Sequence, residues 1–139
     1  MIILDTNVLS ELMKLTPDPS VARWLDGHAP ESVWTTAVSV YELRVGIERM
    51  APGRRRRDLE GQFERVIFED LRERVLAFDR PAAYNAAALE AKRRTAGRPV
   101  EVRDTMIAGI VTSRRAEFAT GNVRHFADLG VRVIDPWST

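Results

Sequence analysis

Residues 1–7 constrain the fold more than any other stretch of this 139-residue chain. Ile2–Leu4 is a continuous apolar run, which is typical of a strand covered on both faces, since such strands do not alternate apolar and polar residues. The run stops at Asp5, which a hydroxyl and an amide residue follow. In open α/β sheets, ligands bind at the carboxyl ends of the strands. Asp5 is therefore predicted to lie at a ligand-binding edge.

Short strand-forming segments alternate with helical segments along the rest of the chain. Further strands are expected at residues 32–37, 75–78, 117–120 and 131–134, and helices at 8–15, 19–27, 40–50, 54–74, 82–95, 102–115 and 122–129. Ser39 is expected to cap the third helix, and Gly46 to allow its close packing. The alternation indicates βαβ units with right-handed crossovers. We expect residues 1–139 to form one α/β domain, a three-layer sandwich with a central, mostly parallel sheet.

Composition excludes several classes of protein. The chain has no cysteine, so disulfides, zinc–thiolate sites and cysteine nucleophiles are ruled out. No segment approaches the ~18 apolar residues of a membrane span and no signal peptide is evident, so a soluble cytoplasmic protein without a membrane partner is expected. Net charge is only +1, but arginines are clustered, notably at residues 54–57. Arginine suits phosphate recognition, but on charge alone solvated helix faces are the favoured explanation of the pattern.

Three acids, Asp5, Glu42 and Asp104, each follow a strand or open a helix that is otherwise built of core residues. Each has a simple structural explanation: a helix cap, a capping box with Ser39, and a favourable interaction with a helix dipole. If the three met at one sheet edge, however, they would repel and raise one another's pKa. A divalent cation removes that cost, and Mg²⁺ takes one or two protein carboxylates while keeping several waters.

Four segments resemble, in order, the PIN-domain ribonucleases, and in particular the VapC/FitB-like toxins of bacterial toxin–antitoxin pairs. These segments are ILDTNVLSE (residues 3–11), YELRVG (41–46), RDTMIA (103–108) and ATGNVRHF (119–126). The closing VIDPW (133–137) is also similar to that subgroup. The resemblance spans nearly the whole chain, and it implies a PIN-like fold.

The resemblance assigns catalytic roles to Asp5, Glu42 and Asp104, which match the family's three metal-binding acids. It implies Mg²⁺ (or Mn²⁺) bound by Asp5 and Asp104, with Glu42 acting directly or through water. A secondary polar site of hydroxyl and amide residues would hold phosphate oxygens or metal waters; its members are Thr6, Asn7, Thr120 and Asn122. Asn122 replaces a fourth acid, and His125 stands where many relatives have another Asp. This departure weakens the case for a second metal and leaves a one-metal site intact.

The implied activity is divalent-metal-dependent endoribonuclease cleavage of RNA phosphodiesters by water, as the toxin of a toxin–antitoxin pair. The implied partners are RNA, a cognate VapB-like antitoxin and a second copy of the chain in a homodimer. Salt-sensitive arginine contacts supply most non-specific affinity for nucleic acids. The candidates for RNA binding are Arg44, Arg93, Arg94 and Arg98. Tyr41, Tyr84 and the three tryptophans are expected to pack in the core or in interfaces.

Three alternatives remain open. Because Asn122 and His125 depart from the family pattern, the chain could be a catalytically weakened RNA- or antitoxin-binding module. A metal-independent ribonuclease would use the only two histidines, His28 and His125, and would survive chelation. A phosphotransferase with an aspartyl nucleophile at Asp5 would need a second acid two residues on, where the chain has Asn7.

Overall fold

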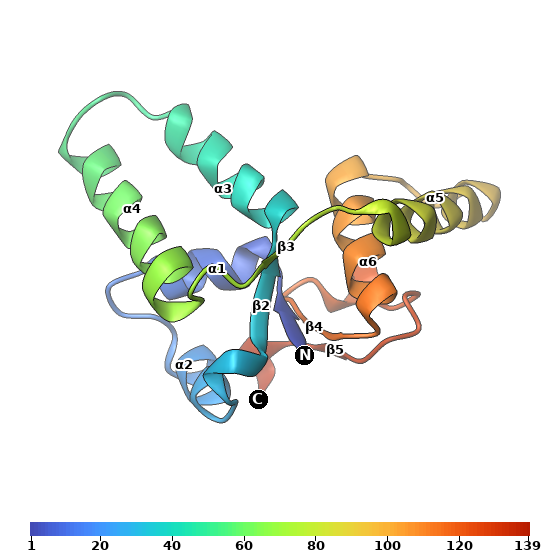
Figure 1. The fold of residues 1–139 in the computed structure, drawn as a ribbon, viewed down its shortest axis with the longest axis horizontal. Helices are drawn as coiled ribbons and strands as arrows, with labels where there is room; N and C mark the ends of the chain where they lie inside the picture. The colour runs from blue at the N-terminus through green and yellow to red at the C-terminus, as the bar shows by residue number, and fades with distance from the viewer.

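The computed structural model describes all 139 residues, and it places β1 (Ile2–Leu4) at the centre of a five-stranded parallel sheet (Figure 1). The other strands are β2 (Val33–Thr36), β3 (Val75–Leu76), β4 (Glu117–Ala119) and β5 (Val133–Ile134), in the order β3-β2-β1-β4-β5. Ile3 pairs with Trp34 on one side and with Phe118 on the other. The chain thus winds outward from β1 in one direction and then in the other, so β1 and β4 flank the topological switch point, where ligands bind in such sheets.

Six α-helices pack against the sheet. They are α1 (Thr6–Met13), α2 (Pro19–Asp26), α3 (Ala37–Glu48), α4 (Arg54–Glu64), α5 (Arg80–Thr95) and α6 (Val102–Arg114). Several begin at a side-chain cap: the carboxylates of Asp5, Asp18 and Asp79 accept hydrogen bonds from backbone amides of the first turns of α1, α2 and α5. None of the helices is both long and apolar enough to cross a bilayer.

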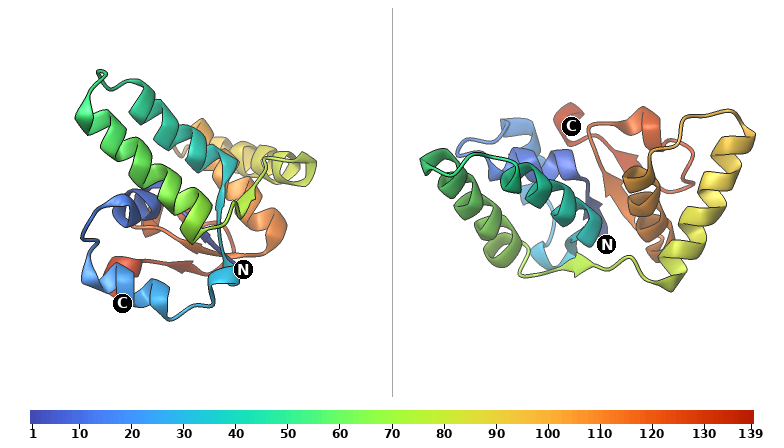
Figure 2. Two further views of the ribbon diagram at one scale, coloured as in Figure 1. Left: turned by 60° about the vertical axis from the view of Figure 1, so that its left-hand side comes forward. Right: turned by 90° about the horizontal axis from the view of Figure 1, so that it is seen from above.

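Two apolar cores lie on opposite faces of the sheet. Leu4 belongs to the core beneath α1, α2, α3 and α4, whereas its neighbour Ile3 belongs to the core beneath α5 and α6. This switch follows the two-residue period of a strand. Figures 1 and 2 show the helices in two groups, with the α3–α4 hairpin on one side and the α5–α6 pair on the other. The predicted three-layer α/β sandwich is confirmed, and its sheet is entirely parallel.

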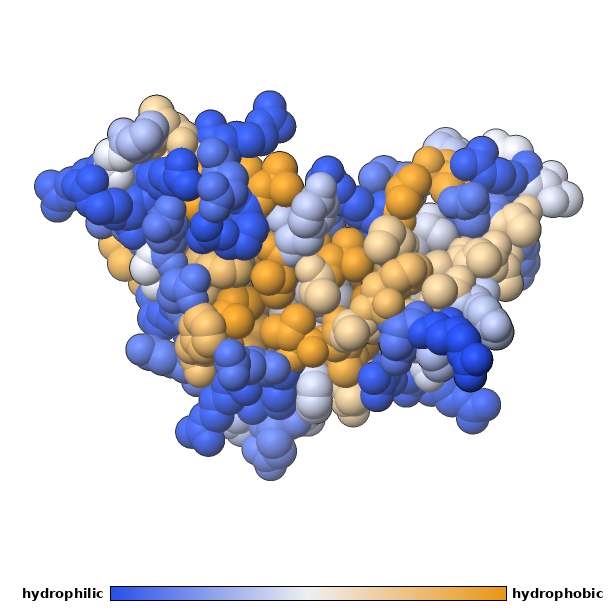
Figure 3. Space-filling model, turned by 45° about the horizontal axis from the view of Figure 1, so that its top comes forward, coloured by the Kyte–Doolittle hydropathy of each residue, from blue (hydrophilic) through white to orange (hydrophobic).

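The surface between the two helical groups is hollowed. The space-filling view shows two arms with a notch between them, the left one largely hydrophilic and the right one mixed, and apolar side chains gather across the middle of this face (Figure 3). Among the large apolar or aromatic side chains that the structure exposes are Tyr41 and Phe68.

The start of α3 differs from the prediction. Thr36 caps this helix, because its Oγ1 accepts a hydrogen bond from the backbone N–H of Ser39 at 3.0 Å. The prediction that Ser39 is the cap was wrong, and the capping-box explanation for Glu42 is lost with it. The predicted close packing at Gly46 was also wrong, since a Cβ there would meet nothing within 4 Å. The close approach occurs instead at Gly109 in α6, where a Cβ would lie 2.3 Å from the carbonyl oxygen of Ala82 in α5.

The helix predicted for residues 54–74 is shorter and changes its winding. After Glu64 the chain forms a π-helical segment, Arg65–Asp70, in which the N–H of Leu71 donates to the carbonyl oxygen of Val66 at 2.9 Å. Wider winding at this point leaves Val66 and Leu71 both buried. The helix predicted for residues 122–129 is a single 3₁₀ turn, Val123–Phe126. These differences do not alter the order of the elements.

Candidate active site

Asp5 lies at the carboxyl end of β1 and is only 6% exposed. Its Oδ1 accepts a hydrogen bond from the N–H of Thr6 at 2.8 Å, and its Oδ2 accepts from the hydroxyl of Thr120 at 2.7 Å and from Nδ2 of Asn7 at 3.4 Å. Burial raises the pKa of Asp5 above its ordinary value; the bonds from Thr120 and Thr6 oppose this rise, and the charge of Asp104 adds to it. Asp5 therefore caps α1 and also presents a buried, fixed carboxylate at the sheet edge.

Glu42 reaches the same place from α3. Its Oε1 accepts a hydrogen bond from the hydroxyl of Thr6 at 3.1 Å, and that hydroxyl lies 3.0 Å from the hydroxyl of Ser39. Burial raises the pKa of Glu42, and the negative charges of Asp104 and Asp5 raise it further. Thr6 directly follows Asp5, so its hydroxyl connects the end of β1 to Glu42.

Asp104 lies in the first turn of α6, where its N–H donates to Oε2 of Glu101 at 2.9 Å. Its Oδ2 lies 2.9 Å from Nε2 of His125, which comes from the 3₁₀ turn after β4. Burial raises the pKa of Asp104, the nearby His125 lowers it, and the charge of Glu101 raises it. The charge of Asp104 raises the pKa of both Asp5 and Glu42, so the three predicted acids lie in one neighbourhood.

A hard divalent cation suits this set of donors. The three groups are carboxylates, the oxygen ligands that Mg²⁺ and Mn²⁺ prefer, and each is held partly out of water, where its charge lacks full compensation. No three acidic or imidazole groups already stand in a ready-made metal cluster. Coordination by one or two carboxylates and several waters, which Mg²⁺ commonly adopts, does not require such a cluster.

The four predicted secondary polar residues form a network around Asp5. Asn7 accepts a hydrogen bond from the N–H of Gly121 at 3.1 Å and donates to the hydroxyl of Thr120 at 3.3 Å. The N–H of Asn122 also donates to this hydroxyl, at 3.0 Å. The network joins the ends of β1 and β4, so it fixes the loops on both sides of the topological switch point.

The four predicted RNA-binding arginines lie in different environments. The guanidinium of Arg44 pairs with Glu48, and Arg94, with a side chain 65% exposed, pairs with Glu90. Arg98 is 39% exposed and pairs with Asp128 at 2.6 Å. These three remain accessible at the surface to differing degrees.

Arg93 is enclosed inside the protein. It is 1% exposed, and it donates to Asp128 at 2.8 and 2.9 Å and to the carbonyl oxygen of His125 at 2.9 Å. A phosphate cannot reach a guanidinium so enclosed, so the expectation that Arg93 contacts RNA is not retained. Its bonds instead tie α5 to the turn that carries His125 beside Asp104, a positioning contact that sequence reasoning missed.

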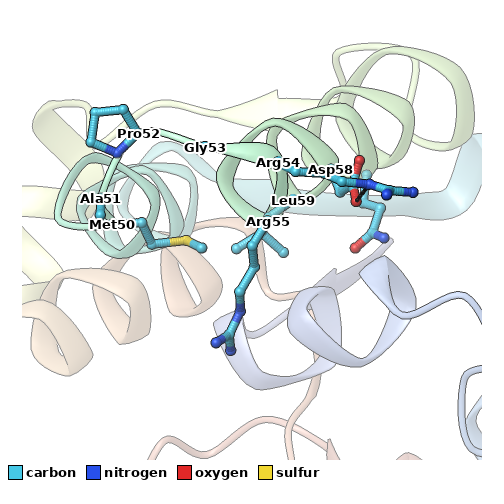
Figure 4. Close-up of a pocket in the computed structure, with 9 residues that line it drawn as sticks. Met50, Ala51, Pro52, Gly53, Arg54, Arg55, Asp58 and Leu59 are labelled. Atoms are coloured by element: carbon cyan, nitrogen blue, oxygen red, sulfur yellow. Dashed lines mark ion pairs between the residues drawn. The ribbon is translucent and has the colours of Figure 1, made fainter.

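The arginine cluster at residues 54–57 lies away from the acids. It opens α4 beside a wide surface depression at the turn between α3 and α4, whose lining includes Met50, Pro52, Gly53 and Leu59 (Figure 4). Arg56 is engaged within the hairpin by Glu48 and Glu60. None of the three site acids lines this depression.

Two side chains beside the acids, one exposed and one half-buried, were not anticipated. Tyr41, expected to pack, is 55% exposed, and the guanidinium of Arg103 lies 5.1 Å from the centre of its ring. These residues immediately precede Glu42 on α3 and Asp104 on α6. The tryptophans, by contrast, are partly buried and pack against the two cores as expected.

Comparison with known proteins agrees with this arrangement. Residues 2–131 match the PIN domain family. The chain is 36% identical to VapC ribonuclease Y4jK of Sinorhizobium fredii over 137 residues, covering 99% of this chain and 98% of the relative. It is 33% identical to Toxin FitB of Neisseria gonorrhoeae, covering 99% of each. The crystal structure of FitAcB from Neisseria gonorrhoeae superposes with a TM-score of 0.85 at 32% identity and full coverage of both chains. This chain therefore belongs to the PIN-domain family.

Proposed function

We propose that this protein is a divalent-metal-dependent endoribonuclease that acts as the toxin of a toxin–antitoxin pair. The observation that carries the proposal is the arrangement at the carboxyl end of β1: Thr6, the residue after Asp5, donates a hydrogen bond to Glu42, and the charge of Asp104 raises the pKa of both acids. The names of the relatives, a VapC ribonuclease, Toxin FitB and the tRNA(fMet)-specific endonuclease VapC of Shigella flexneri (30% identical), support the same reaction class.

Asp5 and Asp104 would hold Mg²⁺ or Mn²⁺, with Glu42 acting directly or through water. Such an ion, when bound, polarises a phosphate and lowers the pKa of water. The protein's own groups supply the orientation. Asp5 is fixed by three hydrogen bonds, and Thr6 holds Oε1 of Glu42 and leaves Oε2 free to take a proton from the attacking water. Attack by water instead of the RNA 2′-hydroxyl predicts products with 5′-phosphate and 3′-hydroxyl ends.

The remaining members of the site would contact the substrate. Thr120, Asn7 and Asn122 lie around Asp5, where they would orient phosphate oxygens or waters. The accessible Arg44, Arg94 and Arg98 are the proposed contacts to the RNA backbone. Arg93 is left out of this set because it is buried.

A VapB-like antitoxin is the proposed protein partner. Solved structures similar to this chain include FitAB bound to a DNA fragment (TM-score 0.87, 32% identity) and DNA-bound VapBC from Salmonella typhimurium (TM-score 0.78, 27% identity). The apolar surface between the two arms supports a second copy of the chain as a further partner, in a homodimer (Figure 3). The proposed location is the cytoplasm, where RNA and the antitoxin are made.

The deciding experiment compares cleavage of total RNA by the parent protein and by Asp5→Asn, with Mg²⁺, Mn²⁺ or EDTA, followed by mapping of the product ends. Asp58→Asn is the control, because it removes an exposed carboxylate at the distant α3–α4 turn. We expect the parent and Asp58→Asn to cleave equally and to give 5′-phosphate ends, and Asp5→Asn to lose at least about 100-fold in rate, since charge-stabilising groups contribute on that scale.

Two outcomes would contradict the proposal. Cleavage that survives EDTA would favour the pair of histidines, His28 and His125, as acid and base. A parent that binds RNA as tightly as Asp5→Asn but never cleaves it would favour the catalytically weakened binding module. The contact between His125 and Asp104 supports that alternative, because it occupies an oxygen of a proposed metal ligand.

A further inference from the structure

Tyr41 and Arg103 form a cross-helix pair beside the acidic site. Tyr41 comes from α3 and Arg103 from α6, two helices that pack against each other, and the guanidinium lies 5.1 Å from the ring centre. We propose that this pair is a nucleotide platform, on which the base of an unpaired RNA nucleotide stacks against Tyr41 while Arg103 contacts the adjoining phosphate. The inference rests on the proposed ribonuclease function and names the form of substrate that the site takes, a single-stranded segment.

The strongest support for the platform is the position of the pair next to the proposed catalytic acids. Tyr41 directly precedes Glu42 and Arg103 directly precedes Asp104, so each member is one residue away from a proposed catalytic acid. The positive charge of Arg103 is close enough to Glu42 to lower the pKa of that carboxyl. A nucleotide held by this pair would therefore place a neighbouring phosphate beside the acids.

The chemistry of the pair fits a nucleotide better than it fits a structural role. Tyr41 is 55% exposed and belongs to neither apolar core. Arg103 contacts that ring, whereas Arg44, Arg93 and Arg98 are all paired with carboxylates. An aromatic ring and a cation are the two components by which proteins hold single-stranded nucleic acid: bases stack on the ring, and the cation contacts the backbone.

The form of the substrate follows from the same geometry. A base can stack on a protein ring only when it is splayed out of a helix, and sequence-specific RNA recognition uses loops, bulges and ends for this reason. A duplex would present its phosphates to Arg103 but would withhold its bases from Tyr41. The platform therefore predicts a preference for unpaired over paired RNA.

The chain also supplies a matched control. Tyr84 on α5 is 67% exposed and borders a surface depression together with Arg80, Thr112 and Ser113. That depression lies at the carboxyl end of α6, whereas Asp104 is in its first turn. Tyr84 is thus an exposed tyrosine near an arginine, next to the end of α6 that is opposite Asp104.

The experiment measures binding of the full-length protein in EDTA, so that no metal-dependent cleavage occurs. The probes are a mixed-sequence single-stranded RNA carrying 2-aminopurine and the same RNA annealed to its complement. We expect Tyr41→Ala to weaken single-strand binding about 5- to 100-fold and to abolish the stacking quench of 2-aminopurine, while Tyr41→Phe keeps both. Tyr84→Ala should behave as the parent. Arg103→Gln should reduce the slope of log affinity against log salt by roughly 0.7, as expected for one lost phosphate contact to a single strand.

Several results would overturn the platform. Unchanged single-strand binding by Tyr41→Ala would do so, as would an equal loss on the duplex, or no measurable RNA binding by the parent. A Tyr41→Ala variant that binds RNA normally but loses the antitoxin would assign the pair to a protein interface. These outcomes are separate from the cleavage test. RNA binding by a parent that does not cleave would contradict the nuclease and keep the platform. A Tyr41→Ala variant that binds and cleaves RNA like the parent would keep the nuclease and contradict the platform.

Discussion

Asp5 caps a helix and is also the first acid of the proposed site. As a helix cap it stabilises the first turn of α1, and it is also a carboxylate whose burial raises its pKa, with the charge of Asp104 adding to the rise. The cap explanation and the site explanation were alternatives at the level of sequence. The structure shows the cap, and it leaves room for the proposed site as well, because the carboxyl end of a strand is also where the next helix begins. Its position after a buried strand made Asp5 predictable.

Arg93 and Arg94 mark the limit of prediction at the scale of residues. They are adjacent in an alanine-rich helix, and nothing in their local sequence distinguishes them. About 100° of helical rotation separates their side chains, so Arg93 is buried against Asp128 and Arg94 lies exposed beside Glu90. Only the docking of α5 against the turn that contains Asp128 decides which arginine is enclosed, and that docking is a tertiary event.

The enclosed ion pair makes a testable contribution to acid stability. The hydrogen bond from Arg93 holds the pKa of Asp128 below its ordinary value, and the charge of Arg98 adds to this effect. The folded state therefore favours the charged carboxylate. This stabilisation is complete above the pKa of about 3.9 that an unfolded Asp has, and it is lost as pH falls through the lower folded value. We expect Asp128→Asn to lower the free energy of unfolding at pH 7 by roughly 2–4 kcal/mol, because Arg93 stays buried without its anion.

Urea denaturation at pH 7 and at pH 3 checks this expectation. The difference between Asp128→Asn and the parent should shrink at pH 3, since the parent then begins to lose the same charge. The control Asp58→Asn removes an exposed carboxylate 3.9 Å from Arg54, and it should change stability by less than about 0.5 kcal/mol at either pH. An equal deficit for Asp128→Asn at both pH values would show that packing, not charge, explains the effect.

At the scale of elements, strand and helix identity could be predicted, whereas local departures from ideal geometry could not. Each strand appears in the sequence as a short run of strand-forming residues, and all five were found at the expected places. The π-helical segment at Arg65–Asp70 was not predicted, because one extra residue in a turn leaves a periodic pattern almost unchanged. Thr36 was missed as a cap for a related reason: it lies inside a strand-forming run that it also terminates.

Two of the helix glycines, Gly109 and Gly46, are expected to change stability in opposite directions when replaced by alanine. Gly109 lies where α6 crosses α5, and a Cβ would overlap the Ala82 carbonyl, at 2.3 Å, and the Ala86 side chain, at 2.7 Å. We expect Gly109→Ala to destabilise the protein by about 1–3 kcal/mol or more, since a packed core must shift to admit the methyl group. Gly46 has open space around it, so Gly46→Ala should stabilise α3 by roughly 0.5–1 kcal/mol.

Thermal and urea denaturation of the two single variants would test the pair together. Both substitutions add the same methyl group within a helix, so helix propensity is matched and only the surroundings differ. If Gly109→Ala were as stable as the parent, the close contact between α5 and α6 would be absent in solution. If Gly46→Ala were destabilising, then the apparently open face of α3 would have to be covered, and a second copy of the chain would be the first candidate to cover it.

At the scale of the whole molecule, the sheet order brings together residues that are far apart in the sequence. β1 and β4 are neighbours although more than a hundred residues separate them, and their ends share the network around Asp5 and Thr120. The strand–helix alternation implied a parallel sheet, and a parallel sheet collects the ends of its strands at one edge, so the meeting of the acids could be anticipated. The contact of His125 with Asp104 could not, because the path of a 3₁₀ turn depends on what it packs against.

This arrangement predicts that a divalent cation stabilises the entire fold. The acids come from the end of β1, from α3 and from α6, and burial raises the pKa of each, so the metal-free protein holds costly negative charge where its parts join. Saturating Mn²⁺ or Mg²⁺ should raise Tm and the free energy of unfolding, by about 2.7 kcal/mol at a concentration of 100 Kd. Amide hydrogen exchange should slow in the first turns of both α3 and α6, since the ion would connect them.

The matched comparison is between Asp104→Asn, which should lose the metal-dependent shift, and Asp58→Asn, which should keep it because that carboxylate lies at the distant α3–α4 turn. Chelation should return the parent to its metal-free Tm. An equal shift in both variants would mean that the ion binds elsewhere or acts only by screening charge. Protection confined to α6 would mean that Glu42 takes no part in holding the ion, directly or through water, and its role would then be restricted to proton transfer. The stability measurement therefore separates the binding role of each acid from its part in the reaction, which a cleavage assay alone cannot do.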